Sequence, residues 1–103
     1  MGVGDLSYRK GRRFEWQVRT LFEENGWVVL RTARSKPVDL VALKNGNVLL
    51  IECKYGSRLR IREKSKLIEL AEIAGGQPIL AFREKYKHRV ILVNLKTGTS
   101  FNL

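Results

Sequence analysis

The sequence predicts one α/β domain in which a mixed sheet of about five strands lies between two helices. Two segments, 8–25 and 61–74, have apolar residues at helical spacing, and five short apolar segments have the length and composition of strands. An Asn-Gly pair separates two of these strands, as in a tight hairpin. With 103 residues, 44% of them hydrophobic, the chain suits a single domain, residues 1–103, around one core.

Both helices are predicted from an apolar stripe along one side. In the first helix the stripe recurs at i, i+4, i+7 and i+8, and its members are Phe14, Val18, Leu21 and Phe22. In the second helix the residues on one face are Leu67, Leu70, Ala71 and Ala74. Gly26 and the pair Gly75-Gly76 follow the two segments directly, where glycine commonly ends a helix.

The strands are predicted at 27–32, 38–43, 47–54, 78–83 and 89–95. Asn45-Gly46 is the strongest short-range signal for a two-residue hairpin turn. This turn sets the register of the hairpin, because it places Lys44 opposite Asn47 and, further along the ladder, Asp39 opposite Glu52. The predicted order is α-β-β-β-α-β-β, with a helix on each side of the sheet.

The hairpin register brings two carboxylates together at the end of a buried pair of strands. Side chains directly opposite each other have Cβ atoms about 4.5–5.5 Å apart, and like charges there are destabilising. Lys54 lies two residues after Glu52 and therefore shares its face. A hard divalent cation such as Mg²⁺ takes carboxylate ligands, so we expect Asp39 and Glu52 to share a metal ion. The alternative is a structural Glu52–Lys54 ion pair, with Asp39 merely ending a loop.

Glu15 is a candidate third acidic ligand. It lies at the edge of the apolar stripe of the first helix, from which its carboxylate can lean over the hairpin; the alternative is an ordinary solvated helix glutamate. Gly11 precedes it by one turn. A glycine there costs helix stability, about 1 kcal/mol against alanine, but permits another backbone to approach closely.

The charge of the chain predicts a polyanionic partner. Lys and Arg number 20 against 10 Asp and Glu, which gives a net charge of +10, and the pI is about 10.3. A compact domain this basic is typical of nucleic-acid binding, although such charge can also serve solubility alone. The residues expected to contact DNA phosphates are Lys10, Arg12, Arg13, Arg34, Lys36, Arg58, Arg60 and Arg62. The last three alternate with apolar residues, so we expect a strand-like arm to present them.

Several classes of protein are disfavoured. No run of apolar residues approaches the roughly 18 needed for a membrane span, and the first residues lack the apolar centre of a signal peptide. Cys53 is the only cysteine, which argues against a disulfide or a Cys-based zinc site and fits the reducing cytoplasm. His88 is the only histidine, so a Ser-His-Asp triad is not expected.

These residues resemble a known family. Asp39 followed by Glu52-x-Lys54 is similar to the motif of the PD-(D/E)xK nuclease superfamily, although Val38 separates Pro37 from the Asp. The flanking segments 9–35 and 68–82 resemble archaeal Holliday junction resolvases of the Hjc type. The positions that match are Lys10-Gly11, Glu15, Gly26-Trp27, Arg31 and Ser35. The resemblance covers roughly residues 9 to 95.

The resemblance implies a restriction-endonuclease-like core and a homodimer that binds four-way junction DNA. It implies symmetric nicks in two opposing strands, with Mg²⁺ or Mn²⁺ as the cofactor. Asp39 and Glu52 would ligate the metal, with Glu15 as a further ligand, and Lys54 would orient water or stabilise the transition state. Ser35 would touch the phosphate of the cut strand, and Arg31 would help to place the DNA.

The sequence is also compatible with two other functions. One is a different nuclease of the same superfamily, such as a nickase or a repair nuclease. The other is a basic DNA-binding module without catalysis, although such a module would be free to lose acidic residues that repel phosphates. For the homodimer, the expected interface is the last strand, 89–95, with the tail 99–103, because an edge strand there needs covering.

Overall fold

The computed structural model describes the backbone of residues 3–33 and 37–103, and the side chains from Arg9 onward within those ranges. Two helices and six strands follow one another along the chain. They are α1 (Val3–Glu24), β1 (Val28–Arg31), β2 (Leu40–Lys44), β3 (Asn47–Tyr55), α2 (Ile61–Ala74), β4 (Gln77–Arg83), β5 (Ile91–Asn94) and β6 (Thr99–Ser100).

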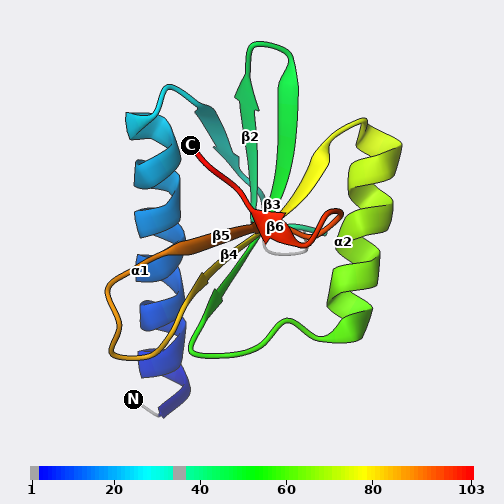
Figure 1. Ribbon diagram of the computed structural model, residues 1–103. Helices are drawn as coiled ribbons and strands as arrows, with labels where there is room; N and C mark the ends of the chain where they lie inside the picture. The colour runs from blue at the N-terminus through cyan, green and yellow to red at the C-terminus, as the bar shows by residue number, and fades with distance from the viewer. Residues whose placement is uncertain (1–2, 34–36) are drawn as a thin grey trace.

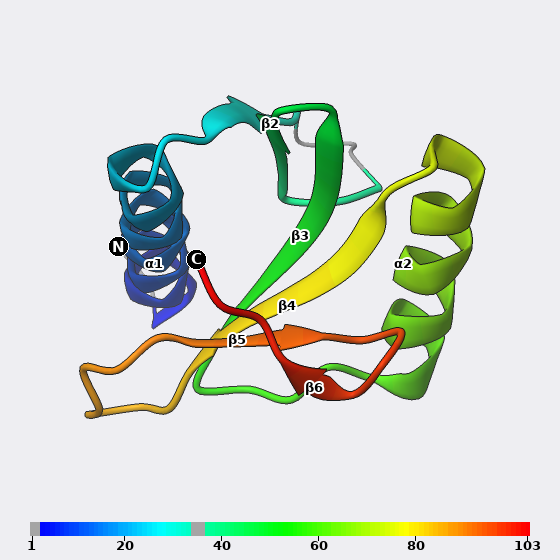
Figure 2. The same ribbon diagram turned by 45° about the horizontal axis from the view of Figure 1, so that its top comes forward.

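The strands form one mixed sheet in the order β1-β2-β3-β4-β5-β6. Only β3 and β4 are parallel, and they are connected through α2, because parallel neighbours need a crossover. The two helices lie on opposite faces of the sheet, α1 on one and α2 on the other (Figures 1 and 2). The predicted mixed sheet between two helices is therefore confirmed.

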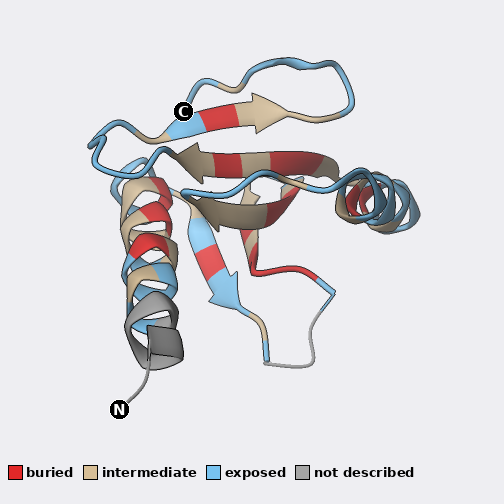
Figure 3. Ribbon diagram, turned by 90° about the horizontal axis from the view of Figure 1, so that it is seen from below, coloured by how far each residue is buried: buried red, intermediate tan, exposed pale blue. Residues whose placement is uncertain are grey.

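The main core lies between α1 and the sheet. The predicted stripe of α1 faces inward, with Phe14, Val18 and Phe22 almost fully buried, and the buried residues of the sheet gather opposite them (Figure 3). A smaller core on the other face joins α2 to β3 through Leu50, Leu67 and their neighbours. Burying both faces of β3 fixes the direction of every side chain along that strand, including those of the candidate site.

The hairpin has the register that the sequence predicts. Lys44 pairs with Asn47, and the ladder runs to Leu40 opposite Ile51. Asn45 and Gly46 both have positive φ, 49° and 79°, as a type I′ turn requires. Asp39 precedes the first ladder residue of β2, and its N–H donates to the carbonyl of Ile51 at 3.2 Å. The ladder ends at Leu40 opposite Ile51, so the direct pairing of Asp39 with Glu52 stays a prediction.

The second helix is fixed at both ends by local chemistry. At its start, the N–H of Arg60 donates to the Glu63 carboxylate at 3.1 Å, one half of a capping box. At its end, Gly75 adopts the left-handed conformation, with φ 69°. A Cβ added at Gly76 would lie 2.7 Å from the carbonyl oxygen of Val48, so only glycine allows this close approach to β3.

The structure differs from the sequence prediction in several places. A sixth strand, β6, pairs with β5, and α1 begins at Val3, not near residue 8. The predicted strand-like arm is wrong for Arg62, because the capped helix α2 has already begun at Ile61. The expected close approach at Gly11 is also absent from the described chain, where no atom lies within 4 Å of an added Cβ.

The end of the chain returns to the main core. Phe101, expected in a dimer interface, is half-buried, with its ring stacked on Phe22 and edge-on to Trp27 at centroid distances of 6.3 Å. Leu103 and Ile91 remain more exposed, at 42% and 38%. Neither helix of the described residues has the length and apolar character to cross a membrane.

Candidate active site

Asp39 is held firmly at the end of the hairpin. It is the one buried charged residue of the described chain, with 7% of its surface exposed. Its Oδ2 accepts a hydrogen bond of 2.8 Å from the N–H of Cys53, the residue between Glu52 and Lys54. Its own carbonyl oxygen accepts the N–H of Thr32 at 3.3 Å. These bonds orient the Asp39 carboxylate toward the segment of β3 that carries Glu52 and Lys54.

Lys54 has a partner that the sequence does not reveal. Its Nζ donates to Oε2 of Glu63, in the first turn of α2, at 2.7 Å. The alternative suggested by the sequence, an ion pair between Lys54 and Glu52, is not the pair formed. Glu63 thus accepts hydrogen bonds through both oxygens, from Arg60 and from Lys54. In the sequence, the only indication of a role for Glu63 is its place at the third position of the predicted helix, which is the position of the Glu in a capping box.

The electrostatics of this pair favour the charged form of Glu63. The hydrogen bond from Lys54 is the largest cause that lowers the pKa of Glu63 below its ordinary value of 4.5, and the N–H of Arg60 lowers it further. Partial burial acts in the opposite direction. The two side chains are 22% and 32% exposed, so water still reaches the pair. Glu63 therefore presents a fixed negative charge to the Lys54 ammonium.

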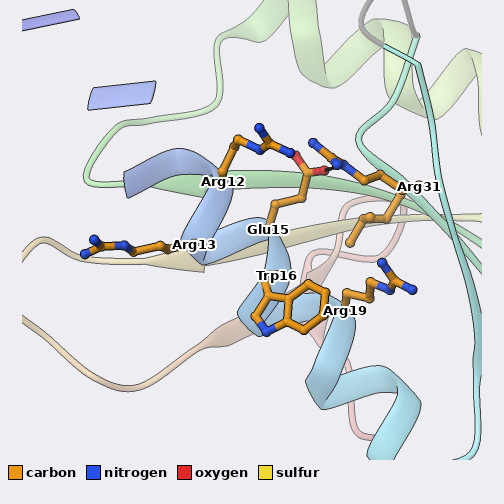
Figure 4. A pocket seen from close by; sticks show the side chains of 7 residues that line it. Arg12, Arg13, Glu15, Trp16, Arg19 and Arg31 are labelled. Atoms are coloured by element: carbon orange, nitrogen blue, oxygen red, sulfur yellow. Dashed lines mark hydrogen bonds and ion pairs between the residues drawn. The ribbon is translucent and has the colours of Figure 1, made fainter. Parts of the chain in front are cut away.

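Glu15 lies with Arg31 on the side of the sheet that α1 covers. The Nε of Arg31 donates to Oε1 of Glu15 at 3.0 Å, and the Glu15 side chain is only 17% exposed. Arg12 and Arg31 approach this carboxylate from two sides (Figure 4). Within residues 9–33 and 37–103, no three acidic, histidine or cysteine side chains are grouped as metal ligands. Glu15 as a third ligand stays a prediction that requires its carboxylate to leave Arg31.

Tyr55 ends β3 on the α1 side. The Arg83 guanidinium lies 4.7 Å from the centroid of its ring. A hydrogen bond from Arg83 is the largest cause that lowers the pKa of Tyr55 below its ordinary 10.0, with desolvation acting against it. Arg83 also donates to Oε1 of Gln17 at 2.6 Å. These contacts join the end of β3, next to Lys54, to α1.

The basic residues expected to bind DNA flank the candidate site on two sides. On α1, Arg12 and Arg13 are exposed and Lys10 is half-exposed. After β3, the exposed residues are Arg58 and Arg60 in the loop and Arg62 in α2. Figure 1 shows the first half of α1, the loop after β3 and the start of α2 at the same end of the molecule. Ser35, Arg34 and Lys36 lie outside the described residues.

The donor set fits a hard divalent cation. Asp39 Oδ2 is bonded to the N–H of Cys53, the residue that follows Glu52, so two carboxyl residues lie on bonded segments at this end of the hairpin. Mg²⁺ characteristically binds one or two carboxylates together with water and substrate phosphates. The lysine nearby supplies positive charge for a phosphate. A mixed sheet between two helices, with an Asp and a Glu-x-Lys on one hairpin and arginines around them, defines the class of PD-(D/E)xK nucleases.

Comparison with known proteins identifies the family within this class. Residues 6–100 match the family described as archaeal Holliday junction resolvase (Hjc). A crossover junction endodeoxyribonuclease Hjc of Methanocaldococcus jannaschii is 41% identical over 91 residues, an alignment that covers 84% of this chain and 67% of that protein. The chain therefore belongs to the archaeal Holliday junction resolvase family, and the resemblance seen in the sequence is confirmed.

The fold is also similar to that of a solved resolvase structure. A solved structure of Archaeoglobus fulgidus Hjc, a Holliday junction resolvase from an archaeal hyperthermophile, superposes with a TM-score of 0.73. The two chains are 23% identical, and the match covers 84% of this chain and 74% of the other. The predicted restriction-endonuclease-like core is thus confirmed by the arrangement of the elements.

Proposed function

We propose that this chain is an endodeoxyribonuclease that resolves four-way DNA junctions by a pair of nicks in opposing strands. The observation that carries the proposal is the hairpin of a family member in which Asp39 is bonded to Cys53, between Glu52 and Lys54 on β3. Nucleases of this family generally depend on a divalent metal, and we infer Mg²⁺, with Mn²⁺ able to replace it. The protein would act on DNA in the cytoplasm.

Each residue of the candidate site has a separate role in this proposal. Asp39 and Glu52 would hold the cation, and the bond from Cys53 keeps the Asp39 carboxylate in place for it. A cation bound there would supply Lewis acidity and lower the pKa of the attacking water. Lys54 presents its protonated Nζ to the phosphate, where negative charge increases as the bond breaks. Glu63 keeps this ammonium oriented when no DNA is bound.

The basic residues on both sides of the hairpin bind DNA without reading its sequence. Contacts from Arg and Lys to phosphates position a duplex but carry no sequence information. The described chain has no element outside the nuclease core that would read bases in a groove. This arrangement suits a protein that selects DNA by its shape. Because the chain belongs to the Holliday junction resolvase family, we infer that the selected shape is the four-way junction.

We extend the proposal to a symmetric homodimer. One chain carries one Asp39–Glu52 pair, whereas two opposing strands need two cuts, and a two-fold dimer matches the symmetry of the junction. Ile91 and Leu103 lie in one groove along β5 and β6, of about 260 Å³, and supply exposed apolar surface for the contact. Leu103→Asp is expected to give a monomer in sedimentation. Ile73→Asp, at an exposed apolar residue of α2 outside this groove, is the control. A dimer that survives Leu103→Asp would refute this surface.

The function is tested with a panel of DNA shapes of matched sequence. Four-way, flap, duplex and single-stranded DNA are incubated with the protein in Mg²⁺ and in EDTA. The proposal predicts cleavage of the four-way junction alone, and only with Mg²⁺. Equal cleavage of flap or duplex DNA would favour a nickase or repair nuclease of the same superfamily. Binding without cleavage of any substrate would favour a DNA-binding module.

A further inference from the structure

Helix α1 carries a second stripe that the core does not use. Its members recur at i, i+3, i+4 and i+7, and they are Arg12, Glu15, Trp16 and Arg19. They form one wall of a pocket of about 360 Å³, a volume within the range of ligand sites. The residues that line it are Arg12, Arg13, Glu15, Trp16, Arg19, Arg31 and Leu40 (Figure 4).

Trp16 is the unusual member of this pocket. Its side chain is large and apolar, yet 63% of it is exposed. The Arg19 guanidinium lies 5.3 Å from the centroid of the indole ring, in the range of a cation–π contact. Arg19 therefore holds the ring at the wall of the pocket (Figure 4). An exposed aromatic ring among four arginines contributes little to the fold and matches a ligand that is both flat and anionic.

We propose that Trp16 stacks on a nucleobase at the branch point of the junction, while the arginines of the pocket contact the adjoining phosphates. The inference rests on the proposed function and deepens it. Stacking on aromatic side chains is how proteins bind unpaired nucleotides, and Arg adds attraction for both phosphate and ring. The pocket is also placed for this role, because it includes Glu15 and reaches Leu40, which follows Asp39. The pocket lies on the α1 side of the sheet, next to the end of β2 that follows Asp39.

Two observations favour a base at the branch point over other occupants. A second copy of the chain in a two-fold contact would bring this patch against itself, and four arginines would then face four arginines. A continuous duplex offers no base face to a side chain, because every base is covered by its neighbours, and extruding one costs a few kcal/mol. The branch point is where stacking is interrupted and that cost is lowest.

The first test compares junction and duplex affinities of Trp16→Ala and Trp16→Phe in EDTA, where binding is measured without cleavage. Removing one stacked base should weaken junction binding about 5- to 150-fold in the Ala variant, and less in the Phe variant. Duplex affinity should not change. The slope of log K against log[salt] should also stay the same, because every arginine that binds a phosphate is retained. Tyr86→Ala is the matched control, since Tyr86 is 85% exposed beside Lys85 and lies outside the pocket.

The second test places the fluorescent base 2-aminopurine at the branch point. The wild-type protein should quench its emission by stacking, and Trp16→Ala should not. Unchanged quenching together with unchanged junction affinity in Trp16→Ala would overturn the inference. Dissociation of a dimer by Trp16→Ala would overturn it in favour of a protein contact. A wild-type protein that binds junction and duplex equally would instead refute the proposed function, so the two failures are distinguishable.

Discussion

Replacing Glu63 by Gln removes the negative charge that faces Lys54 and keeps an oxygen that can accept the N–H of Arg60. The ion pair that this change removes joins atoms 2.7 Å apart on side chains that are 22% and 32% exposed. Fully exposed ion pairs contribute about 0.2–1 kcal/mol, and partial burial moves this pair to the upper end. We therefore expect Glu63→Gln to lower the free energy of unfolding by about 1 kcal/mol at pH 7, or Tm by about 4–8 °C.

The dependence of this effect on pH follows from the sign of the pKa shift. The pKa of Glu63 is lowered in the folded chain, chiefly by Lys54. The ion pair therefore makes its full contribution to the free energy of unfolding at pH values above 4.5, the ordinary pKa of the group. It is lost as the pH falls below 4.5 and through the lower pKa of the folded state. The difference in stability between wild type and Glu63→Gln should therefore shrink in acid.

Thermal melts at pH 7 and pH 3 measure the difference, with Glu69→Gln, at an exposed residue of the same helix, as the control. Cleavage under single-turnover conditions measures the role in catalysis. If the pair serves to orient Lys54, the loss of about 1 kcal/mol should slow cleavage about fivefold and leave junction affinity unchanged. A variant as stable as wild type at pH 7, or a difference that persists at pH 3, would refute the reasoning.

Three further predictions concern other parts of the chain. Asp39→Asn should abolish cleavage and keep junction binding, because Asn can still accept the N–H of Cys53; residual cleavage near the wild-type rate would exclude Asp39 as a metal ligand. Neutralising Arg58 and Arg62 should weaken binding to all DNA and reduce the slope of log K against log[salt] by about 0.9 for each phosphate that the variant no longer neutralises. An unchanged slope would place the DNA elsewhere. Gly11→Ala should stabilise α1 by about 1 kcal/mol, since no atom lies near the added methyl group, and an unchanged Tm would contradict this.

The parts of the structure that the sequence predicts are those that local chemistry determines. Asn45-Gly46 defines the hairpin because both residues tolerate positive φ, and the apolar face of β3 then leaves one register. The stripe of α1 is predicted for the same reason, since its period matches one buried face. The pairing of Asp39 with Glu52, one step beyond the last pair of the ladder, stays a prediction from the sequence.

The parts that the sequence does not predict depend on distance across the fold. The Lys54–Glu63 pair requires the loop after β3 to bring the start of α2 back over the hairpin, and no local pattern fixes that path. The Glu15–Arg31 pair joins residues 16 apart on a helix and a strand, and it engages the carboxylate that the sequence suggests as a metal ligand. β6 has two residues, too few for a period, and exists through its pairing with β5.

Cleavage of a supercoiled plasmid that carries a cruciform tests the central claim most directly. The cruciform is a four-way junction, and two nicks in opposing strands within one binding event give linear DNA, whereas independent nicks give open circles first. Paired cleavage at a metal site predicts linear product from the start of the reaction in Mg²⁺, and no product in EDTA or with Asp39→Asn. Open circles that accumulate ahead of linear DNA, or cleavage that continues in EDTA, would contradict it.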